Sequence, residues 1–162
     1  MGQSESAFSV RNVSFAYNGI PALDDLSLEV NSGERVALLG PNGSGKSTTV
    51  KIITGLLEPS SGKVFFNGRN IQDDLAAYKR LVGYVPEEAN LYPFLSGFEY
   101  LQLVGRLRGL SEALIARRAG AMLEMFAMKP HRHTAISAYS KGMRQRILLI
   151  AALLHNPDLL VF

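Results

Sequence analysis

Gly40-Pro41-Asn42-Gly43-Ser44-Gly45-Lys46-Ser47-Thr48 is the stretch of sequence that decides the fold of this chain. Its glycines allow consecutive backbone N–H groups to curl around an anion. The Lys46 ammonium can then reach the terminal phosphates, and the Ser47 hydroxyl can ligate Mg²⁺. We therefore expect residues 40–48 to bind a nucleoside triphosphate.

The segments on either side of this loop support the same interpretation. The apolar run Arg35–Leu39 is expected to be a buried parallel strand, and Lys46–Ile53 has the pattern of an amphipathic helix. The phosphates would then lie at a helix N-terminus, where N–H groups without partners point at the anion. A Gly/Ser-rich connecting loop is the alternative. A Lys-Ser pair after the last glycine, in a strand-loop-helix setting, favours the phosphate loop.

The residues before the loop predict an antiparallel pair of strands. Phe8–Tyr17 alternates between apolar and polar residues, Asn18-Gly19 forms a turn, and Ala22–Val30 is the partner strand. Together with Arg35–Leu39, this pattern predicts two antiparallel strands flanking a buried parallel one.

The residues after the loop alternate between strands and helices. We expect short strands at Lys63–Phe66, Leu81–Val85 and Leu159–Phe162, a helix at Asp74–Arg80, two helices between Leu91 and Met128 with Ser111 as an N-cap, and a buried helix at Ser140–Leu154. The fold class is therefore α/β: a phosphate-loop core with an antiparallel β subdomain and an inserted helical subdomain. The expected divisions are residues 1–86, 87–139 and 140–162.

The composition restricts the class of protein and the cell compartment expected for this chain. The chain has 162 residues, 47% of them hydrophobic, with no cysteine and a net charge of +3. These values are typical of one soluble globular domain without disulfides or thiolate metal sites. The basic residues are dispersed, so a nucleic-acid partner is not indicated. No apolar run of eighteen residues and no secretory signal occur, which favours a cytoplasmic protein.

Several motifs in order resemble the nucleotide-binding domain of ATP-binding cassette (ABC) proteins. Tyr17 matches the aromatic residue that stacks on adenine, and Gly40 to Thr48 matches Walker A. Tyr84-Val85-Pro86-Glu87 lies where the family has its Q-loop. Tyr139 to Arg146 resembles the signature sequence, and Leu159–Phe162 resembles the opening of Walker B. The resemblance implies ATP and Mg²⁺ as cofactors. Taken alone, such a tyrosine is more often a strand residue that covers the edge of a core, but its place ahead of Walker A favours stacking.

The signature has a physical meaning of its own. Ser140 and Gly142 start a helix, so a hydroxyl and N–H groups face an anion there. The resemblance implies that Ser140, Lys141 and Gly142 contact the γ-phosphate bound by a second subunit, in a homodimer or a paired ABC subunit. An ordinary capped helix start is the alternative.

Two positions depart from the general family pattern. Glu87 replaces the Q-loop glutamine, and the signature reads Tyr-Ser-Lys-Gly-Met. Both variants resemble the bacterial exporter branch that includes drug-resistance, sodium-efflux and heme-export ATPases. A Glu87 carboxylate oxygen can still reach Mg²⁺ or water, although it adds negative charge beside the phosphates.

No catalytic residue is expected in this chain. The resemblance implies a Walker B aspartate, a glutamate that activates water and a switch histidine, all beyond Phe162. The domain is therefore expected to be incomplete at its C-terminus, and the chain is expected to bind nucleotide better than it hydrolyses it.

The resemblance implies an ATPase subunit that couples ATP hydrolysis to transport, with export the expected direction. Its partners would be membrane-spanning permease subunits on the inner face of the cell membrane. A soluble ABC ATPase of translation or DNA repair and a nucleotide-binding fragment without activity are the alternatives.

Two smaller patterns are most simply explained by structural roles of their residues. His131-Arg132-His133 could suggest a metal, but without further ligands it is expected to be a solvated loop. Met122, Met125 and Met128 recur at helical spacing, and at least two of the three are expected in the core.

Overall fold

The computed structural model describes residues 6–88 and 90–162. The chain divides into two compact units, one ending at Lys79 and the other beginning at Arg80, and each is described by itself. In neither unit do the described residues include a helix long and apolar enough to span a membrane.

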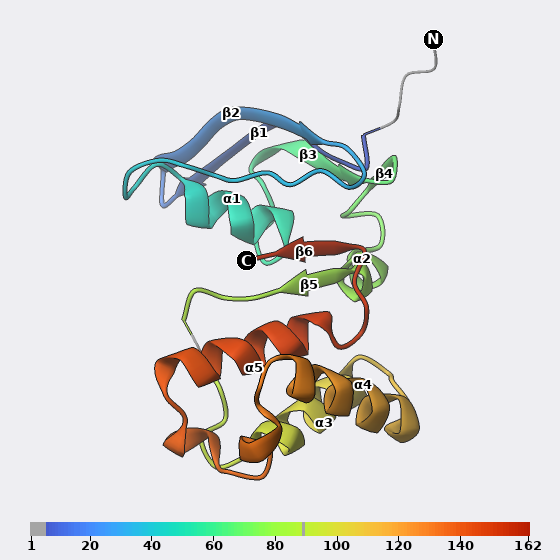
Figure 1. Cartoon of the computed structure of the whole chain (residues 1–162). Coiled ribbons are helices and arrows are strands. Elements are labelled where there is room, and N and C mark those ends of the chain that lie inside the picture. Colours follow the sequence, from blue (N-terminus) through green and yellow to red (C-terminus); the bar gives the residue numbers. More distant parts are fainter. Residues whose placement is uncertain (1–5, 89) are drawn as a thin grey trace. The chain divides into compact units, whose positions relative to one another are not determined.

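A four-stranded antiparallel sheet forms most of the first unit (Figure 1). Its strands are β1 (Phe8–Tyr17), β2 (Ile20–Val30), β3 (Ser61–Phe66) and β4 (Arg69–Asn70), in the order β2-β1-β3-β4. Phe8 lies opposite Val30 on one side and Phe66 on the other. The buried side chains of Phe8, Val10 and Val64 form its inner face. The predicted hairpin of residues 8–30 is confirmed.

Polar residues hold a bulge in the β1–β2 ladder. Asn12 and Asp25 both adopt positive φ, near 50°, and the Asn12 amide donates to Asp25 Oδ1 at 2.8 Å. Backbone N–H groups that the ladder leaves unpaired donate to serine hydroxyls, Asn12 to Ser27 and Asp25 to Ser14, each at 2.9 Å. The bulge therefore bends two long strands without leaving these donors unsatisfied.

Helix α1 (Lys46–Ile53) lies against this sheet (Figure 1). Its Ile52 side chain is buried, and the Tyr78 hydroxyl donates to the Ile53 carbonyl at 2.7 Å. Tyr78 belongs to α2 (Leu75–Leu81), in which the unit boundary falls, and burial raises its pKa. The Tyr78 ring also contacts Phe66 edge-on, which ties α1 and α2 to β3.

The expected strand at Arg35–Leu39 is wrong for this structure. The segment has no regular secondary structure, and Leu39 is 91% exposed. A parallel strand needs neighbours that accept and donate its backbone hydrogen bonds. Within residues 6–88 and 90–162, no strand pairs with this segment.

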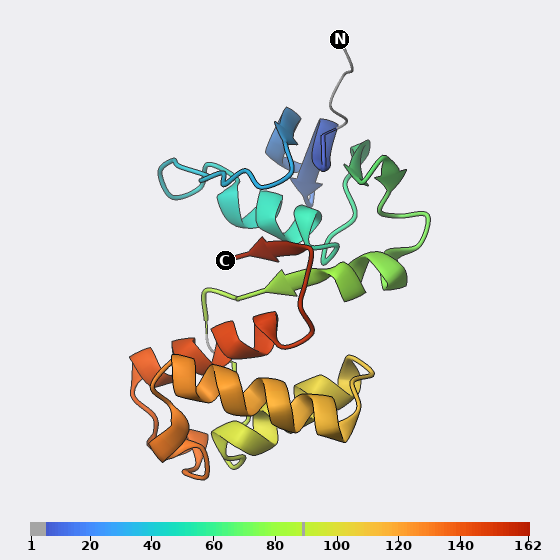
Figure 2. The same ribbon diagram turned by 45° about the vertical axis from the view of Figure 1, so that its right-hand side comes forward.

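The second unit combines a parallel pair of strands with helices (Figure 2). Strands β5 (Val82–Tyr84) and β6 (Leu159–Val161) pair in parallel, with Val82 opposite Leu159. Helix α5 (Lys141–Leu153) lies next to them and buries Ile147 and Ile150 completely. The predicted buried helix and the short strand after it are confirmed.

Two further helices complete this unit. Helix α3 (Gly97–Leu107) and helix α4 (Glu112–Met125) pack against each other and against α5. A Cβ on Gly105 would lie 2.6 Å from Ile115 Cγ1, so glycine permits the close contact between α3 and α4. The 3₁₀ turns η1 (Lys129–His131) and η2 (Ile136–Ala138) lead into α5.

The prediction that at least two of Met122, Met125 and Met128 lie in the core is confirmed. Met128 is fully buried and Met122 packs against the core cluster of this unit, whereas Met125 is 79% exposed.

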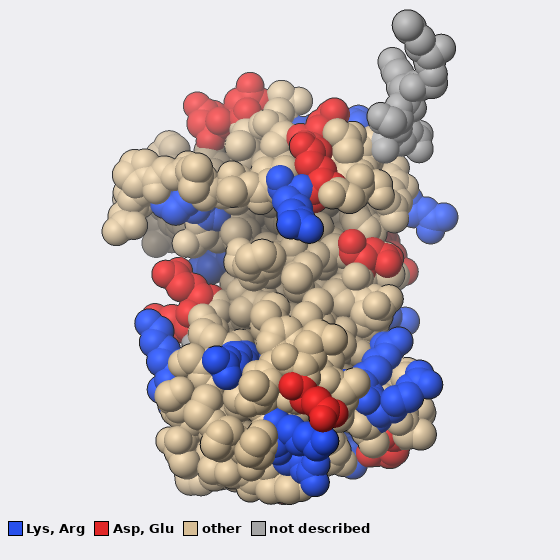
Figure 3. Space-filling model, in the orientation of Figure 1, with Lys and Arg blue, Asp and Glu red and all other residues tan. Residues whose placement is uncertain are grey.

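Charged residues are distributed over the surface. On the face shown in Figure 3, Lys and Arg side chains alternate with Asp and Glu and form several separate patches. This distribution matches the dispersed basic residues of the sequence.

Candidate nucleotide-binding site

The glycine loop is shaped by close backbone contacts within the first unit. Gly45 has a φ of +87°, and a Cβ there would lie 2.6 Å from Leu23 Cδ2 and 2.7 Å from the Ala22 carbonyl oxygen. A Cβ on Gly40 would similarly lie 2.6 Å from Ser44 Oγ. The position of Gly45 therefore requires glycine for the loop to keep this path, whereas at Gly40 a rotation of the Ser44 side chain would make room.

Gly45 is also the N-cap of α1, and no side chain caps the helix there. In contrast, Ser96, Ser111 and Ser140 cap α3, α4 and α5 with their hydroxyls. The first N–H groups of α1 are thus available to an anion, and the positive end of the helix dipole favours one.

Lys46 lies across the same loop. Its ammonium donates to the carbonyl oxygens of Gly40 and Pro41, each at 2.7 Å. The Ser44 N–H donates to the Pro41 carbonyl at 3.3 Å, which closes the turn through Asn42 and Gly43. The lysine charge is therefore held within reach of any anion that enters the loop.

The hydroxyl residues after Lys46 differ in exposure. Ser47 is exposed, whereas Thr48 is only 7% exposed. The structure therefore presents the Ser47 hydroxyl, and not that of Thr48, to solvent at the start of α1.

Tyr17 lies at the end of the β1–β2 hairpin. Its ring is 43% exposed and contacts Phe15 edge-on at a centroid distance of 4.8 Å. Phe15 pairs with Leu23, whose side chain lies beside Gly45. The hairpin end that carries Tyr17 is thus linked to the phosphate loop through Phe15 and Leu23.

Ser140, Lys141 and Gly142 form the exposed start of α5 in the second unit. The Met143 N–H donates to Ser140 Oγ at 3.2 Å, as in a capped helix. A Cβ on Gly142 would meet nothing within 4 Å, so this helix start is open to a ligand.

Tyr139 fixes this helix start and was not singled out by sequence reasoning. It is 3% exposed, its hydroxyl donates to the His131 carbonyl at 2.6 Å, and its own carbonyl accepts from the Arg144 guanidinium. Burial raises the pKa of Tyr139. The sequence feature that could have identified this role is the position of Tyr139 immediately before the Ser-Lys-Gly triplet.

Glu87 lies in the second unit, in an exposed bend after β5. The Val85 N–H just before it donates to the Val161 carbonyl of β6 at 2.9 Å. Across residues 6–88 and 90–162, no group of three or more His, Cys, Asp or Glu side chains is placed to hold a metal.

Tyr17 and residues 40–48 thus belong to the first unit. Glu87 and residues 140–142 lie in the second. A glycine loop that runs into an uncapped helix start, with a lysine across it, defines the class of phosphate-loop nucleotide-binding proteins.

Comparison with known proteins identifies the family within this class. The family described as ABC transporter matches residues 23–162, and the chain therefore belongs to the ABC transporter family.

Two similar proteins are described as ATP-binding proteins. The chain is 39% identical over 153 residues to the uncharacterized ABC transporter ATP-binding protein YxlF of Bacillus subtilis (strain 168), covering 94% of this chain and 50% of YxlF. It is 39% identical over 152 residues to the Nod factor export ATP-binding protein I of Cupriavidus metallidurans, covering 94% of this chain and 50% of that protein. The chain thus spans about half the length of these curated relatives.

Solved structures share the fold. The ATP-binding cassette MJ0796, in a dimeric post-hydrolysis state bound to ADP and Pi, superposes with a TM-score of 0.85 at 29% identity. The match covers 95% of this chain and 72% of the cassette. The α/β cassette fold expected from the sequence is confirmed.

Proposed function

We propose that this chain is the ATP-binding part of an ABC transporter subunit, and that it couples ATP binding and hydrolysis to export through a membrane permease. The uncapped start of α1, with Lys46 across the loop, is the observation that carries the proposal. The relative named for Nod factor export supports export as the direction. The subunit would dock on membrane-spanning partners at the inner face of the membrane.

ATP binding would rearrange the contacts of Lys46. Its ammonium would exchange the Gly40 and Pro41 carbonyls for β- and γ-phosphate oxygens, which carry full negative charge. The N–H groups of Gly43 to Ser47 would hold the phosphates, and the ring of Tyr17 would stack on adenine.

One residue of the loop is well suited to bind Mg²⁺. The exposed Ser47 hydroxyl is an oxygen ligand of the type that Mg²⁺ accepts beside phosphates. When bound, the ion neutralises charge that develops on the phosphate oxygens. We also propose the exposed carboxylate of Glu87 as a ligand, on the basis of its place in the Q-loop motif.

A second subunit would complete each site. Residues 140–142 present a capped helix start and exposed backbone, and we propose that they contact the γ-phosphate bound to the partner, in a homodimer or a paired subunit. The dimeric state of the MJ0796 cassette supports this arrangement.

The isolated chain would bind ATP but hydrolyse it poorly. Asp158 precedes β6, whereas functional side chains in parallel sheets follow the carboxyl ends of the strands. We therefore assign no catalytic base among residues 6–88 and 90–162.

Calorimetry of ATP binding with and without Mg²⁺ tests this function. We expect Lys46→Ala to weaken binding at least about tenfold, because it removes a charge-assisted contact to phosphate. Lys51→Ala, in the last turn of the same helix, is the matched control and should bind as the wild type does. Equal affinity in all three proteins would overturn the proposal. Multiple turnovers of phosphate release by the wild-type chain would refute the assignment of poor hydrolysis.

A further inference from the structure

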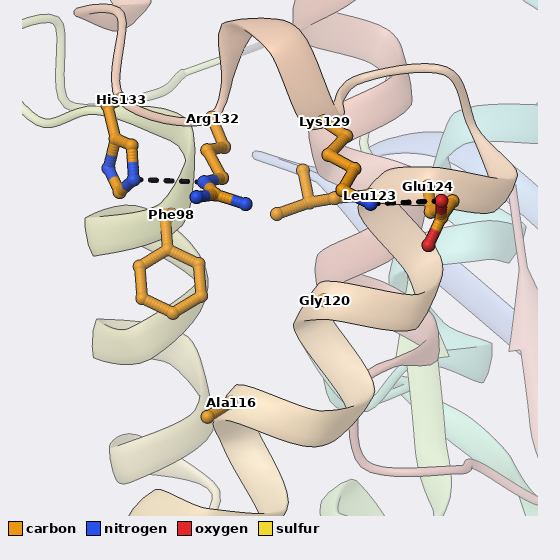
Figure 4. A pocket seen from close by; sticks show the side chains of 8 residues that line it. All are labelled: Phe98, Ala116, Gly120, Leu123, Glu124, Lys129, Arg132 and His133. Carbon is orange, nitrogen blue, oxygen red and sulfur yellow. Dashed lines mark hydrogen bonds and ion pairs between the residues drawn. The ribbon is translucent and has the colours of Figure 1, made fainter.

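A cavity in the second unit lies between α3 and α4, with η1 and the residues after it at its mouth (Figure 4). Its volume is about 370 Å³, within the range of small-molecule sites. The lining residues are Phe98, Ala116, Gly120, Leu123, Glu124, Lys129, Arg132 and His133. Leu123 is buried and Phe98 is half-buried, whereas the other six are exposed, so the cavity is open to solvent. None of them belongs to the nucleotide-binding motifs described above.

Gly120 lines this cavity at an exposed position. It lies inside α4, where glycine is less favourable than alanine, and a Cβ there would meet nothing within 4 Å. Gly105 of α3, by contrast, is required by the nearby Ile115 side chain. Helix packing therefore explains Gly105 but not Gly120, whose missing side chain leaves space on the cavity wall.

Cationic side chains gather at the mouth. Lys129 and Arg132 carry permanent positive charge, and the lining contains one carboxylate, Glu124, which pairs with Lys129 at 3.0 Å. The Arg132 Nε donates to His133 Nε2 at 2.9 Å. In Figure 4 the guanidinium points into the space between Phe98 and Leu123.

The backbone around Arg132 is fixed in place. The Phe98 N–H donates to the Arg132 carbonyl at 2.9 Å, and the Thr134 N–H donates to the His131 carbonyl at 2.9 Å. The His133 ring also contacts the Phe98 ring edge-on. Holding the cation in position lowers the ordering cost of binding an anion.

We propose that this cavity binds a small organic monoanion with a flat apolar body, such as an aromatic carboxylate. The carboxylate pairs with the planar Arg132 guanidinium, which suits it geometrically. The apolar body lies between Phe98 and Leu123, over the space beside Gly120.

The test is a titration of the ¹⁵N-labelled chain with 1-naphthoate, followed by amide chemical shifts. We expect saturable shifts at Phe98, Gly120 and Arg132. Gly120→Leu fills the cavity and Arg132→Gln removes the cation, and each should weaken binding at least about tenfold. Ala113→Leu adds a leucine side chain at an exposed position of α4 outside the cavity lining and should bind as the wild type does. Thermal unfolding verifies that each variant is folded.

Three results would overturn the proposal. The first is the absence of saturable shifts with the wild-type chain at millimolar 1-naphthoate. The second is unchanged affinity in folded Gly120→Leu or folded Arg132→Gln. The third is equal binding of the uncharged 1-naphthamide, because the cationic mouth would then contribute nothing.

Discussion

Single residues set the local geometry of the phosphate loop in the first unit and of the start of α5 in the second. Gly45 permits the contact of the phosphate loop with Ala22 and Leu23, and Lys46 holds its charge against the loop carbonyls. Tyr139 holds the start of α5 in place through its hydrogen bond to the His131 carbonyl, although it contacts no proposed ligand itself. The loop glycines and lysine could be predicted from their spacing. The contacts of Tyr139 could not, because they join residues brought together only by folding.

Replacing Tyr139 with phenylalanine removes its hydrogen bond to the His131 carbonyl. We expect the free energy of unfolding to fall by about 1 kcal/mol, the usual net value of such a bond. Denaturant unfolding measures the change. Tyr92→Phe, at a tyrosine that is 61% exposed, should leave the stability unchanged. A loss no larger than that of the control would show that the Tyr139 hydroxyl does not stabilise this unit.

His155 makes stability depend on pH. Burial lowers its pKa from the ordinary 6.5, and the charges of Arg108 and Arg118 lower it further. Between the folded and unfolded pKa values the unfolded chain binds more protons, so stability should fall as pH drops below about 6.5. His155→Gln should flatten this dependence in urea unfolding between pH 5 and 8. His131→Gln, at an exposed histidine, should retain it, and a retained slope in His155→Gln would contradict the assignment.

Secondary-structure elements followed the sequence wherever their hydrogen bonds are local or shared with a nearby strand. The β1–β2 hairpin, α4 and α5 were predicted close to their observed bounds. The strand predicted at residues 35–39 was wrong. An apolar run predicts a parallel strand, but it does not identify the neighbouring strands that must form its backbone hydrogen bonds. The cavity beside Gly120 was also missed, since sequence pattern gives no measure of empty space.

Helix α3 begins with a capping box that should carry measurable stability. The Glu99 N–H donates to Ser96 Oγ at 3.3 Å, and the Ser96 N–H donates to Glu99 Oε2 at 2.8 Å. The hydrogen bonds from Ser96 lower the pKa of Glu99. Ser96→Ala should cost about 1 kcal/mol in thermal or denaturant unfolding. Ser111→Ala should cost less, because the cap of α4 is longer, at 3.4 Å. The reverse order would contradict this account.

At the scale of the whole molecule, the two units carry different segments proposed to bind ATP. The first holds the phosphate loop and Tyr17, and the second holds Glu87 and the start of α5. The chain spans about half the length of the curated relatives it matches, so transport and its coupling to hydrolysis are proposals for the whole protein. Binding of ATP by the first unit is the claim on which those proposals depend.

The most direct test of that claim is an amide NMR titration of the ¹⁵N-labelled chain with Mg²⁺ and ATP. Our account predicts the largest saturable shifts at Gly43, Gly45, Lys46 and Ser47, because their N–H groups would donate to phosphate oxygens. Lys46→Ala should greatly reduce these shifts at equal ATP concentration. Shifts that are absent, or that gather away from the loop, would contradict the account.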